Sequence, residues 1–466
     1  MAVQIPPTRG SNDEILINAI SCTTATACSA GGFVSTSATT EAFVIDESKG
    51  LWQEAQIIRG TATPGVADNA TINAISCISP GNCSAGGSFV NGEGLSHFQL
   101  LGGEAPTTAF VVNEIHGRWH AAHAVTGVVA PGNEEGATIN YLSCSSAGNC
   151  AAAGRFASAP CADGDNTCVL AGATYKRQFE KSFVVDEVQG VWGSPEWLLE
   201  ANRGEYPNLN GLSCGAPGTC AAVGTSLSPS REQEGFVVTE TSGRWQKSAQ
   251  FPGSELTGQT SSILNAVSCG SRGNCSAGGS YTDKYGKTHP FLVDETSGTW
   301  RRAFAVKGST RPALKPYAQI QSISCGSSND CTAFGESLGS AGKGLYYFVL
   351  TKREGAWGSV RLVPGLASLA FRGFSGSEMA CSANQSCTIA GSYFTQSAVT
   401  KPYALSENIG HFTRLVNLRG IARLNLAPTA GSVVALSCGA RDNCVIVEFF
   451  ASMDYDSSFL VHESAQ

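Results

Sequence analysis

The chain has little charge for its length. Asp, Glu, Lys and Arg make up 14% of its 466 residues, and the formal net charge is −7. The basic residues come in short pairs such as Arg301-Arg302 and Lys352-Arg353, whereas a phosphate-binding surface needs clustered Lys and Arg. The composition therefore argues against a nucleic-acid partner.

Long apolar runs and helical patterns are missing as well. No apolar stretch approaches the length of a membrane span. No segment repeats its apolar residues with the period of an amphipathic helix. No signal peptide is recognisable, so we expect the chain to begin as a mature or recombinant product would. These absences favour an all-β protein without a membrane span.

Cysteine and glycine, in contrast, are abundant, with 18 Cys and 54 Gly. Sixteen of the cysteines form eight pairs in a recurring phrase, which in most copies reads Ser-Cys-x5-Cys-x-Ala-x-Gly. An internal repeat of this regularity dictates the architecture. Repeats 1 to 8 are numbered by their pairs, which are Cys22 with Cys28, Cys77 with Cys83, Cys144 with Cys150, Cys214 with Cys220, Cys269 with Cys275, Cys325 with Cys331, Cys381 with Cys387, and Cys438 with Cys444.

A second phrase, close to Phe-Val-Val-Asp-Glu-x-x-Gly-x-Trp, follows each cysteine phrase and runs from Phe43 to Trp52 in repeat 1. Each repeat then holds four short runs rich in β-branched, aromatic or small residues and bounded by Gly, Asn and Ser, as antiparallel strands are. Most repeats span about 55 residues, the size of a four-stranded propeller blade. The sequence predicts an eight-bladed β-propeller with one cysteine hairpin in each blade.

The two ends of the chain complement each other. Repeat 8 stops at Gln466, soon after Glu463, without the fourth strand of the other copies. Residues 2–5 resemble residues 54–57, a fourth strand, but no repeat precedes them. We therefore expect residues 1–8 to complete the eighth blade, so that residues 1–466 form one ring-closed domain, and we expect a monomer.

The constant spacing of the cysteines favours disulfides. Two cysteines at the adjoining ends of two antiparallel strands lie across a hairpin, where a bond can form. Buried free thiols and a metal site are the alternatives, but zinc sites favour two to four residues between ligands, and the chain has no matching His pairs. The ninth pair, Cys161 and Cys168, is expected to bond locally too. Disulfides imply an oxidising compartment, and hence export to the periplasm, the cell surface or the medium.

Polar residues that recur in nearly every copy are interpreted as framework. Glu recurs in the second phrase, at Glu47 and its counterparts, where a turn or an inter-blade hydrogen bond explains it better than a ligand does. An amide recurs four residues before the first cysteine, as at Asn18 and Gln321. These amides are expected to satisfy backbone groups near the central channel.

The alternation of Ser-Cys-x5-Cys-x-Ala-x-Gly with a Glu-x-x-Gly-x-Trp turn resembles repeat proteins predicted from actinobacterial and related genomes. The resemblance covers nearly the whole chain, and it implies an exported, propeller-like protein, but that family has no established activity. The turn is also similar to the Asp-box of sialidases and to the tryptophan motif of quinoprotein dehydrogenases. Both have three positions from Gly to Trp, whereas Gly298 to Trp300 is two, so neither implies a cofactor or an activity here.

Residues that break the pattern on the side of the channel away from the disulfides form the candidate site. Three places before the first cysteine, where most copies have a small residue, repeats 3 and 7 have Tyr141 and Glu378. Four places after the second cysteine, repeat 8 has Glu448 in place of glycine, and the next position holds Arg155 in repeat 3 and Glu336 in repeat 6. These five side chains form a polar pocket for a ligand such as a sugar, or they pair with one another or with channel water.

Two classes of function agree with these residues. The first is an exported binding or interaction propeller with one asymmetric site, whose partner is a glycan, another polar ligand or a protein surface. The alternative is a hydrolase or lyase that acts on a polysaccharide or glycoside, with two of Glu336, Glu378 and Glu448 as acid and base. Binding is preferred, because no catalytic signature recurs in the chain.

Neither function requires a cofactor. Calcium is the metal that the sequence suggests, because Asp163 and Asp165, between Cys161 and Cys168, resemble part of a calcium loop. A complete site takes six to eight oxygen ligands, and this segment offers too few.

Overall fold

The structure, a computed structural model, describes most of the chain. The described residues are 2–3, 14–36, 39–61, 69–90, 107–127, 136–157, 167–170, 173–176, 181–198, 205–228, 230, 232–253, 259–308, 317–338, 345–364, 374–382, 386–394, 400–408, 411–412, 416–417, 430–440, 443–451 and 456–464. All regular structure in these ranges is β-strand. The predicted all-β class is therefore confirmed.

Each repeat contributes three long antiparallel strands. The first strands are β2 (Glu14–Thr24), β7 (Ala70–Ser79), β12 (Gly136–Ser146), β19 (Glu205–Ala216), β22 (Gln259–Ser271), β27 (Tyr317–Ser327), β32 (Phe374–Cys381) and β37 (Ala430–Ala440). The second strands are β3 (Ala27–Ser35), β8 (Asn82–Val90), β13 (Asn149–Ala157), β20 (Thr219–Leu227), β23 (Asn274–Asp283), β28 (Asp330–Leu338), β33 (Ser386–Phe394) and β38 (Asn443–Ala451). The third strands are β4 (Thr40–Ser48), β9 (Thr107–Ile115), β16 (Lys181–Val188), β21 (Gln233–Thr239), β24 (Thr288–Thr296), β29 (Leu345–Arg353), β34 (Thr400–Asn408) and β39 (Asp456–Ser464).

The predicted fourth strand is split into two short segments, both paired with the third strand. In repeat 1, β5 (Leu51–Trp52) pairs through Glu47 and Trp52, and β6 (Gln56–Ile57) pairs through Phe43 and Ile57. The same pairs elsewhere are β10 (Arg118–Trp119) with β11 (His123–Ala124), β17 (Val191–Trp192) with β18 (Glu196–Trp197), β25 (Thr299–Trp300) with β26 (Phe304–Ala305), β30 (Ala356–Trp357) with β31 (Arg361–Leu362), and β35 (His411–Phe412) with β36 (Val416–Asn417). Three further strands are β1 (Ala2–Val3), β14 (Thr167–Leu170) and β15 (Ala173–Lys176).

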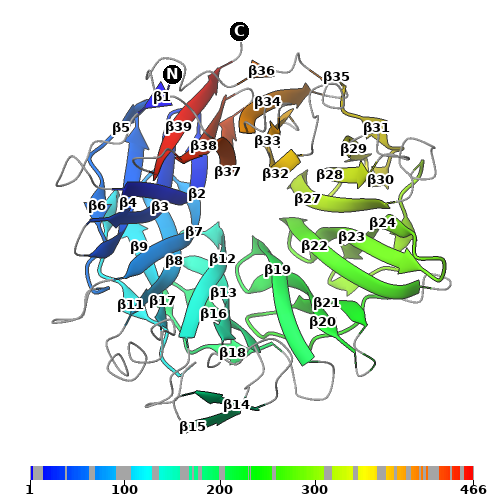
Figure 1. Ribbon diagram of the computed structural model, residues 1–466, viewed down its shortest axis with the longest axis horizontal. Coiled ribbons are helices and arrows are strands. Elements are labelled where there is room, and N and C mark those ends of the chain that lie inside the picture. The colour runs from blue at the N-terminus through cyan, green and yellow to red at the C-terminus, as the bar shows by residue number, and fades with distance from the viewer. Residues whose placement is uncertain are drawn as a thin grey trace.

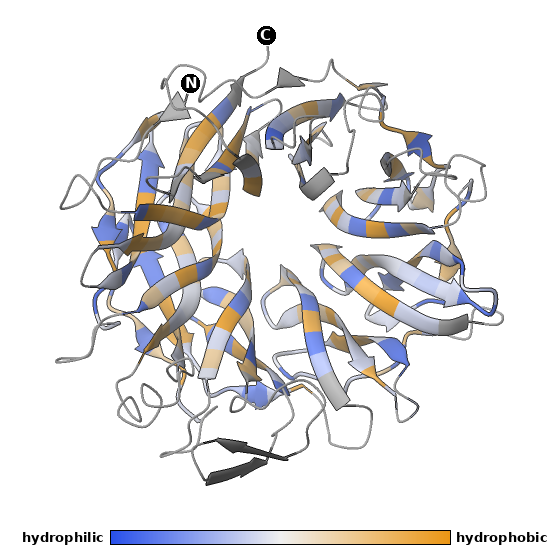
Figure 2. Ribbon diagram, in the orientation of Figure 1, coloured by the Kyte–Doolittle hydropathy of each residue, from blue (hydrophilic) through white to orange (hydrophobic). Residues whose placement is uncertain are grey.

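The sheets stand around a common centre, with the first strands innermost and the two termini close together (Figure 1). β1 pairs with β39, with Ala2 opposite Val461. Hydrophobic and polar residues are interleaved along the long strands (Figure 2). The resulting arrangement is propeller-like.

The hydrophobic cores lie between neighbouring repeats. Ile17 and Phe43 of repeat 1 share a buried cluster with Val447 and Leu460 of repeat 8. Glycine in the second strand permits the close approach, because a Cβ on Gly31 would lie 2.6 Å from Cγ2 of Ile72 in the next repeat. Each sheet is therefore stabilised mainly by burial against its two neighbours.

The recurring turn before the tryptophan has the geometry that its sequence predicts. Lys49 and Gly50 both have positive φ, at 55° and 78°, as the two central residues of a type I′ hairpin do. The pattern recurs at His116 and Gly117 and in four more repeats. The turn directs each tryptophan back against the third strand.

Eight of the predicted disulfides are present, one in each repeat. The two cysteines of a pair face each other directly in the ladder, as Cys144 and Cys150 do. The ninth predicted pair, Cys161 with Cys168, lies outside the residues whose side chains the structure describes. The disulfides indicate that the protein folds in an oxidising environment. The described residues also contain no helix that could span a membrane.

The two cysteines of each pair differ in exposure, which the sequence did not predict. The first cysteine of every pair is partly buried. The second is fully buried, with 1–6% of its surface exposed, in all eight pairs: Cys28, Cys83, Cys150, Cys220, Cys275, Cys331, Cys387 and Cys444. The physical reason is that the second strand carries these residues into the core between neighbouring sheets, where Cys28 packs with residues of repeat 8. These eight pairs are therefore part of the framework.

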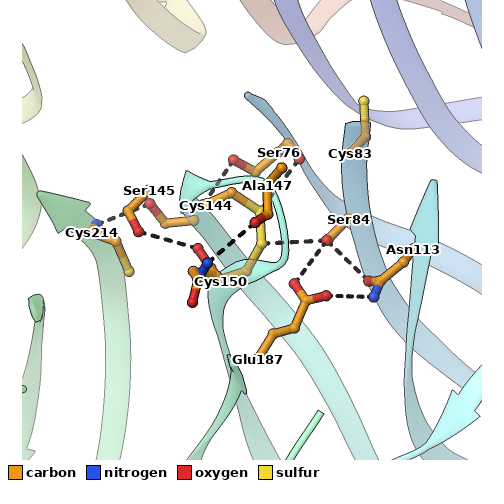
Figure 3. Close-up of a disulfide and its surroundings, with 12 residues drawn as sticks. Ser76, Cys83, Ser84, Asn113, Cys144, Ser145, Ala147, Cys150, Glu187 and Cys214 are labelled. Atoms are coloured by element: carbon orange, nitrogen blue, oxygen red, sulfur yellow. Dashed lines mark hydrogen bonds between the residues drawn. A yellow bond between two sulfur atoms is a disulfide. The ribbon is translucent and has the colours of Figure 1, made fainter. Parts of the chain in front are cut away.

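Recurring polar residues around the disulfides link each repeat to the next. In six repeats the serine before the first cysteine accepts from the backbone of the next repeat, as Ser76 Oγ does from Cys144 N at 3.1 Å. Figure 3 shows a second link, in which Ser84 and Asn113 of repeat 2 donate to the carboxylate of Glu187 in repeat 3. The recurrent glutamate of repeat 3 is thus an inter-repeat contact, one of the two roles expected for this position.

The tryptophans make a third set of links. The indole N–H of Trp119 donates to Asp46 of the preceding repeat at 2.9 Å, and Trp245 donates to Asp186 at 2.9 Å. In repeat 6, Lys352 replaces the recurrent glutamate, and its Nζ lies 3.1 Å from Asp294 of repeat 5. This ion pair shows that the contact tolerates a change of charge at the position of the glutamate.

Candidate functional site

A cavity of about 680 Å³ lies among the first strands of repeats 3 to 7. Its walls are formed largely by the residues two to four places before the first cysteine of each repeat. The described lining residues are Tyr141, Asn210, Gly211, Leu212, Asn265, Ala266, Val267, Gln321, Ser322, Ile323, Glu336, Tyr347 and Glu378. Since the first strands border the central opening (Figure 1), the cavity is part of the centre of the ring of sheets.

The position of these walls follows from a β-bulge in each first strand. The ladder skips one residue at the recurrent amide, for example between Leu209 and Gly211, so that Asn210 has no partner in the ladder. A bulge shifts the alternation of side chains by one place, and the residues after it face the centre.

The recurrent amides bridge repeats around this cavity. Nδ2 of Asn210 donates to the carbonyl of Leu264 at 2.7 Å, and Nδ2 of Asn265 donates to the carbonyl of Ile320 at 2.8 Å. Both amides therefore satisfy a backbone acceptor of the next repeat, as predicted, whereas Gln321 donates to the side chain of Glu336 in its own repeat. Both asparagines also line the cavity.

Tyr141 and Glu378 occupy the same position in repeats 3 and 7, and both line the cavity. Burial raises the pKa of the Tyr141 hydroxyl, the charge of Arg155 opposes that rise, and the charge of Glu378 adds to it. Glu378 is exposed to the cavity, but the surrounding protein desolvates it and raises its pKa. Both groups therefore hold their proton more strongly than they would in water.

Glu336 is held by two amides. Its Oε1 accepts from Nε2 of Gln319 and from Nε2 of Gln321, both at 2.8 Å. Its Oε2 has no hydrogen-bond partner among the described residues. Glu336 therefore presents a fixed oxygen acceptor at the cavity wall.

The other two predicted site residues lie elsewhere. Arg155 is exposed and is not among the described lining residues, although its charge reaches Tyr141. Glu448 is fully buried, with neither carboxylate oxygen bonded within the described residues. Desolvation raises its pKa to about 8, so it carries a proton at neutral pH. The structure thus places Tyr141, Glu336 and Glu378 together and leaves Glu448 apart from them.

Sequence comparison of the repeats did not single out Tyr347, which also lines the cavity. It precedes Phe348, at a position that holds Ala42 in repeat 1 and Ala109 in repeat 2. Comparing the repeats along the third strand, for positions where one copy has a large polar residue and others have a small one, would have found Tyr347. It was missed because the third strand is not innermost.

The candidate calcium ligands, Asp163 and Asp165, lie outside the described residues. Within the described ranges, no group of three or more His, Cys, Asp or Glu side chains has an arrangement that could hold a metal ion.

No family model matches the chain, and no curated protein matches it. Several solved structures have similar folds. The BP39L lectin from Burkholderia pseudomallei is 13% identical with a TM-score of 0.43, covering 87% of this chain and 99% of the lectin. Sqt1 of Chaetomium thermophilum is 12% identical with a TM-score of 0.45, covering 97% of this chain and 96% of its own. A PL25 ulvan lyase is 10% identical with a TM-score of 0.44, covering 83% of this chain and 91% of the lyase. None of these likenesses assigns the chain to a family.

Proposed function

We propose that the chain binds one hydroxyl-rich polar ligand, such as a glycan, in the central cavity. The observation that carries this proposal is the meeting of Tyr141, Glu336 and Glu378 in one cavity of about 680 Å³. At the position of each of these three residues, most other repeats have a smaller residue. A volume of this size lies within the range of small-molecule sites.

The chemistry of the walls suits hydroxyl groups. Carboxylate oxygens of Glu336 and Glu378 accept hydrogen bonds, and amides such as Gln321 both donate and accept. The ring of Tyr141 offers an apolar face with a polar tip. Because the ligating residues differ from repeat to repeat, we expect one site per molecule rather than eight equal sites.

A glycan array followed by calorimetry tests this proposal. Glu336→Gln, Glu378→Gln and Tyr141→Phe should each weaken binding of the glycan that the array identifies by about tenfold or more, the effect of losing one or more hydrogen bonds in a closed site. Glu54→Gln, on an exposed outer residue, is the matched control. Normal binding by all three variants would move the site away from this cavity.

A second candidate function is polysaccharide cleavage, favoured by the different environments of the two cavity carboxylates. Glu378 has a raised pKa, as a general acid needs, whereas Oε1 of Glu336 accepts hydrogen bonds from two amides. Such a division is typical of acid and base pairs. Reducing-sugar release from array-positive polysaccharides, abolished by either Glu→Gln change, would favour catalysis; binding without release would favour the first function.

For the architecture, we propose eight blades in one domain, closed by residues 1–8. Three contacts between repeats 8 and 1 support closure: β1 with β39, Cys22 N with Ser437 Oγ at 2.9 Å, and Trp52 Nε1 with His462 Nε2 at 3.3 Å. Deletion of residues 1–10 should lower the melting temperature and favour aggregation through the exposed edge of β39. An unchanged, monomeric deletion variant would contradict closure by this strand.

We also propose that the protein is exported as a monomer, like the actinobacterial-type repeat proteins that its phrases resemble. Eight disulfides support an oxidising location. Peptide mapping without reduction, applied to protein from the native host, should find all nine local pairs. Free thiols in most repeats, or a larger species in analytical ultracentrifugation, would contradict this.

A further inference from the structure

A second cavity adjoins the first. It has a volume of about 380 Å³ and lies between the sheet of repeat 4 and the first strand of repeat 5. Asn210 and Asn265 line both cavities. The other described lining residues are Asn208, Thr225, Ser226, Leu227, Gln233 and Ile263. Since Leu227 and Gln233 lie at the ends of β20 and β21 away from the disulfide, the second cavity leads away from the cysteines.

The two cavities differ in charge. The described walls of the central cavity include Glu336 and Glu378, whereas the described walls of the second cavity contain no charged side chain. They offer amides and hydroxyls instead. Asn208 and Gln233 are exposed, and the amide of Gln233 has no hydrogen-bond partner among the described residues. The second cavity can therefore donate and accept hydrogen bonds without attracting an ion.

A substitution in repeat 5 gives the second cavity its shape. In repeats 2 and 3 the recurrent amide of the preceding repeat also bonds to a threonine, as Asn18 does to Thr71 at 3.0 Å. In repeat 5 that threonine is replaced by Ile263, and Asn210 bonds instead to Thr225 of its own repeat at 3.2 Å. Ile263 and Leu227 then supply an apolar wall beside the amides. Polar edges with an apolar face suit a sugar ring, which has hydroxyls at its edge and C–H groups on its faces.

We infer that the ligand is a neutral oligosaccharide chain, with one unit in the central cavity and the following units in the second cavity. This inference rests on the proposed function, because it extends the same site. The shared residues Asn210 and Asn265 lie at the junction, so a chain crossing from one cavity to the other contacts them from both sides. The second cavity then selects for chain length, and the central cavity selects for the unit bound there.

A size series tests the inference, using mono- to hexasaccharides of the neutral glycans on the array as probes. Affinity should rise by about tenfold or more from monosaccharide to trisaccharide. The double variant Leu227→Ala, Gln233→Ala should lose that rise while keeping monosaccharide affinity within about twofold, since the apolar wall and one amide are removed from the second cavity alone. Gln53→Ala, at an exposed amide between β5 and β6, is the control.

The outcomes separate the two proposals. If wild type binds mono- and oligosaccharides equally, or if the double variant keeps the full rise with chain length, the second cavity is not part of the site and the inference is wrong. In both cases the proposed function stands. If no glycan binds wild type at all, the proposed function and the inference fail together. Thermal melting of the double variant confirms that its fold is intact.

Discussion

The surroundings of the disulfides and the central cavity are built from the same repeats but use their side chains differently. Around the disulfides, the same residue types recur and bond to the same partners, as Trp119 to Asp46 and Trp245 to Asp186. Around the cavity, Tyr141, Glu336 and Glu378 are each found in one repeat, and the other repeats have a different residue at the same position. In this protein, repetition marks links between repeats, and departure from repetition marks the candidate site.

The largest expected effect comes from breaking a link that contains a buried charge. Asp294→Ala removes the partner of Lys352, whose side chain is 7% exposed, and also an acceptor for Trp357. An uncompensated buried charge costs about 3–5 kcal/mol, so denaturant unfolding should show a loss of that size.

The double variant Asp294→Ala, Lys352→Met provides the control for this prediction, since it removes the charge together with its partner. It should recover a large part of the loss. If Asp294→Ala unfolds like wild type, the ion pair does not hold repeats 5 and 6 together.

The next effect concerns buried carboxyl groups and pH. Burial raises the pKa of Glu448 and of Glu114 to about 8, with Asp46 adding to the rise at Glu114, while the ordinary value is 4.5. Between these values the folded protein holds protons that the unfolded chain releases. The stability that these two protonated groups contribute to the fold is complete below about pH 4.5, and it is lost as the pH rises through about 8. Each group lowers the free energy of unfolding by at most about 1.4 kcal/mol per pH unit in that window.

Glu448→Gln measures the part that this one residue contributes, because glutamine cannot ionise. Urea unfolding at pH 5, 7 and 8.5 should show a shallower decline for the variant than for wild type. Glu54→Gln, on an exposed residue, should leave the decline unchanged. An equal slope in wild type and Glu448→Gln would mean that Glu448 is solvated in solution.

The contrast between the two regions also explains what the sequence could predict. The disulfides, the positive-φ turns and the inter-repeat role of Glu187 follow from local spacing and from recurrence. The grouping of Tyr141 with Glu378 was predictable too, since both stand at one position of the repeat. These are properties that comparing copies reveals.

The placement of Glu448 required the structure. At its position in repeat 1, a Cβ on Gly32 would clash with the carbonyl oxygen of Leu16, so the position faces the first strand's backbone and not the centre. The bulge at the recurrent amide shifts the side-chain alternation of the first strand by one residue relative to the second. Simple counting of positions along both strands therefore does not show which side chains meet.

The second cavity was not predicted from the sequence, because Gln233 and Ile263 are ordinary strand residues and only packing brings them together.

The contact between repeats 8 and 1 departs from its counterparts at one residue. There His462 stands where repeat 2 has Asn113, and its Nε2 faces both Trp52 Nε1 at 3.3 Å and Glu47 Oε1 at 3.1 Å. One ring nitrogen cannot accept from the indole and donate to the carboxylate at the same time. Asn113 does both with its two side-chain atoms, since its Oδ1 accepts from the indole of repeat 3 at 2.9 Å and its Nδ2 donates to the recurrent glutamate there.

The smallest effect is therefore expected at His462. His462→Asn should raise the free energy of unfolding by about 0.5–1.5 kcal/mol, the net value of one hydrogen bond. The reverse change, Asn113→His, should cost a similar amount at the contact between repeats 2 and 3. Paired unfolding curves of the two variants at one pH test whether the contact between repeats 8 and 1 has the same hydrogen-bond requirements as the contact between repeats 2 and 3. A loss of stability in His462→Asn would show that it does not.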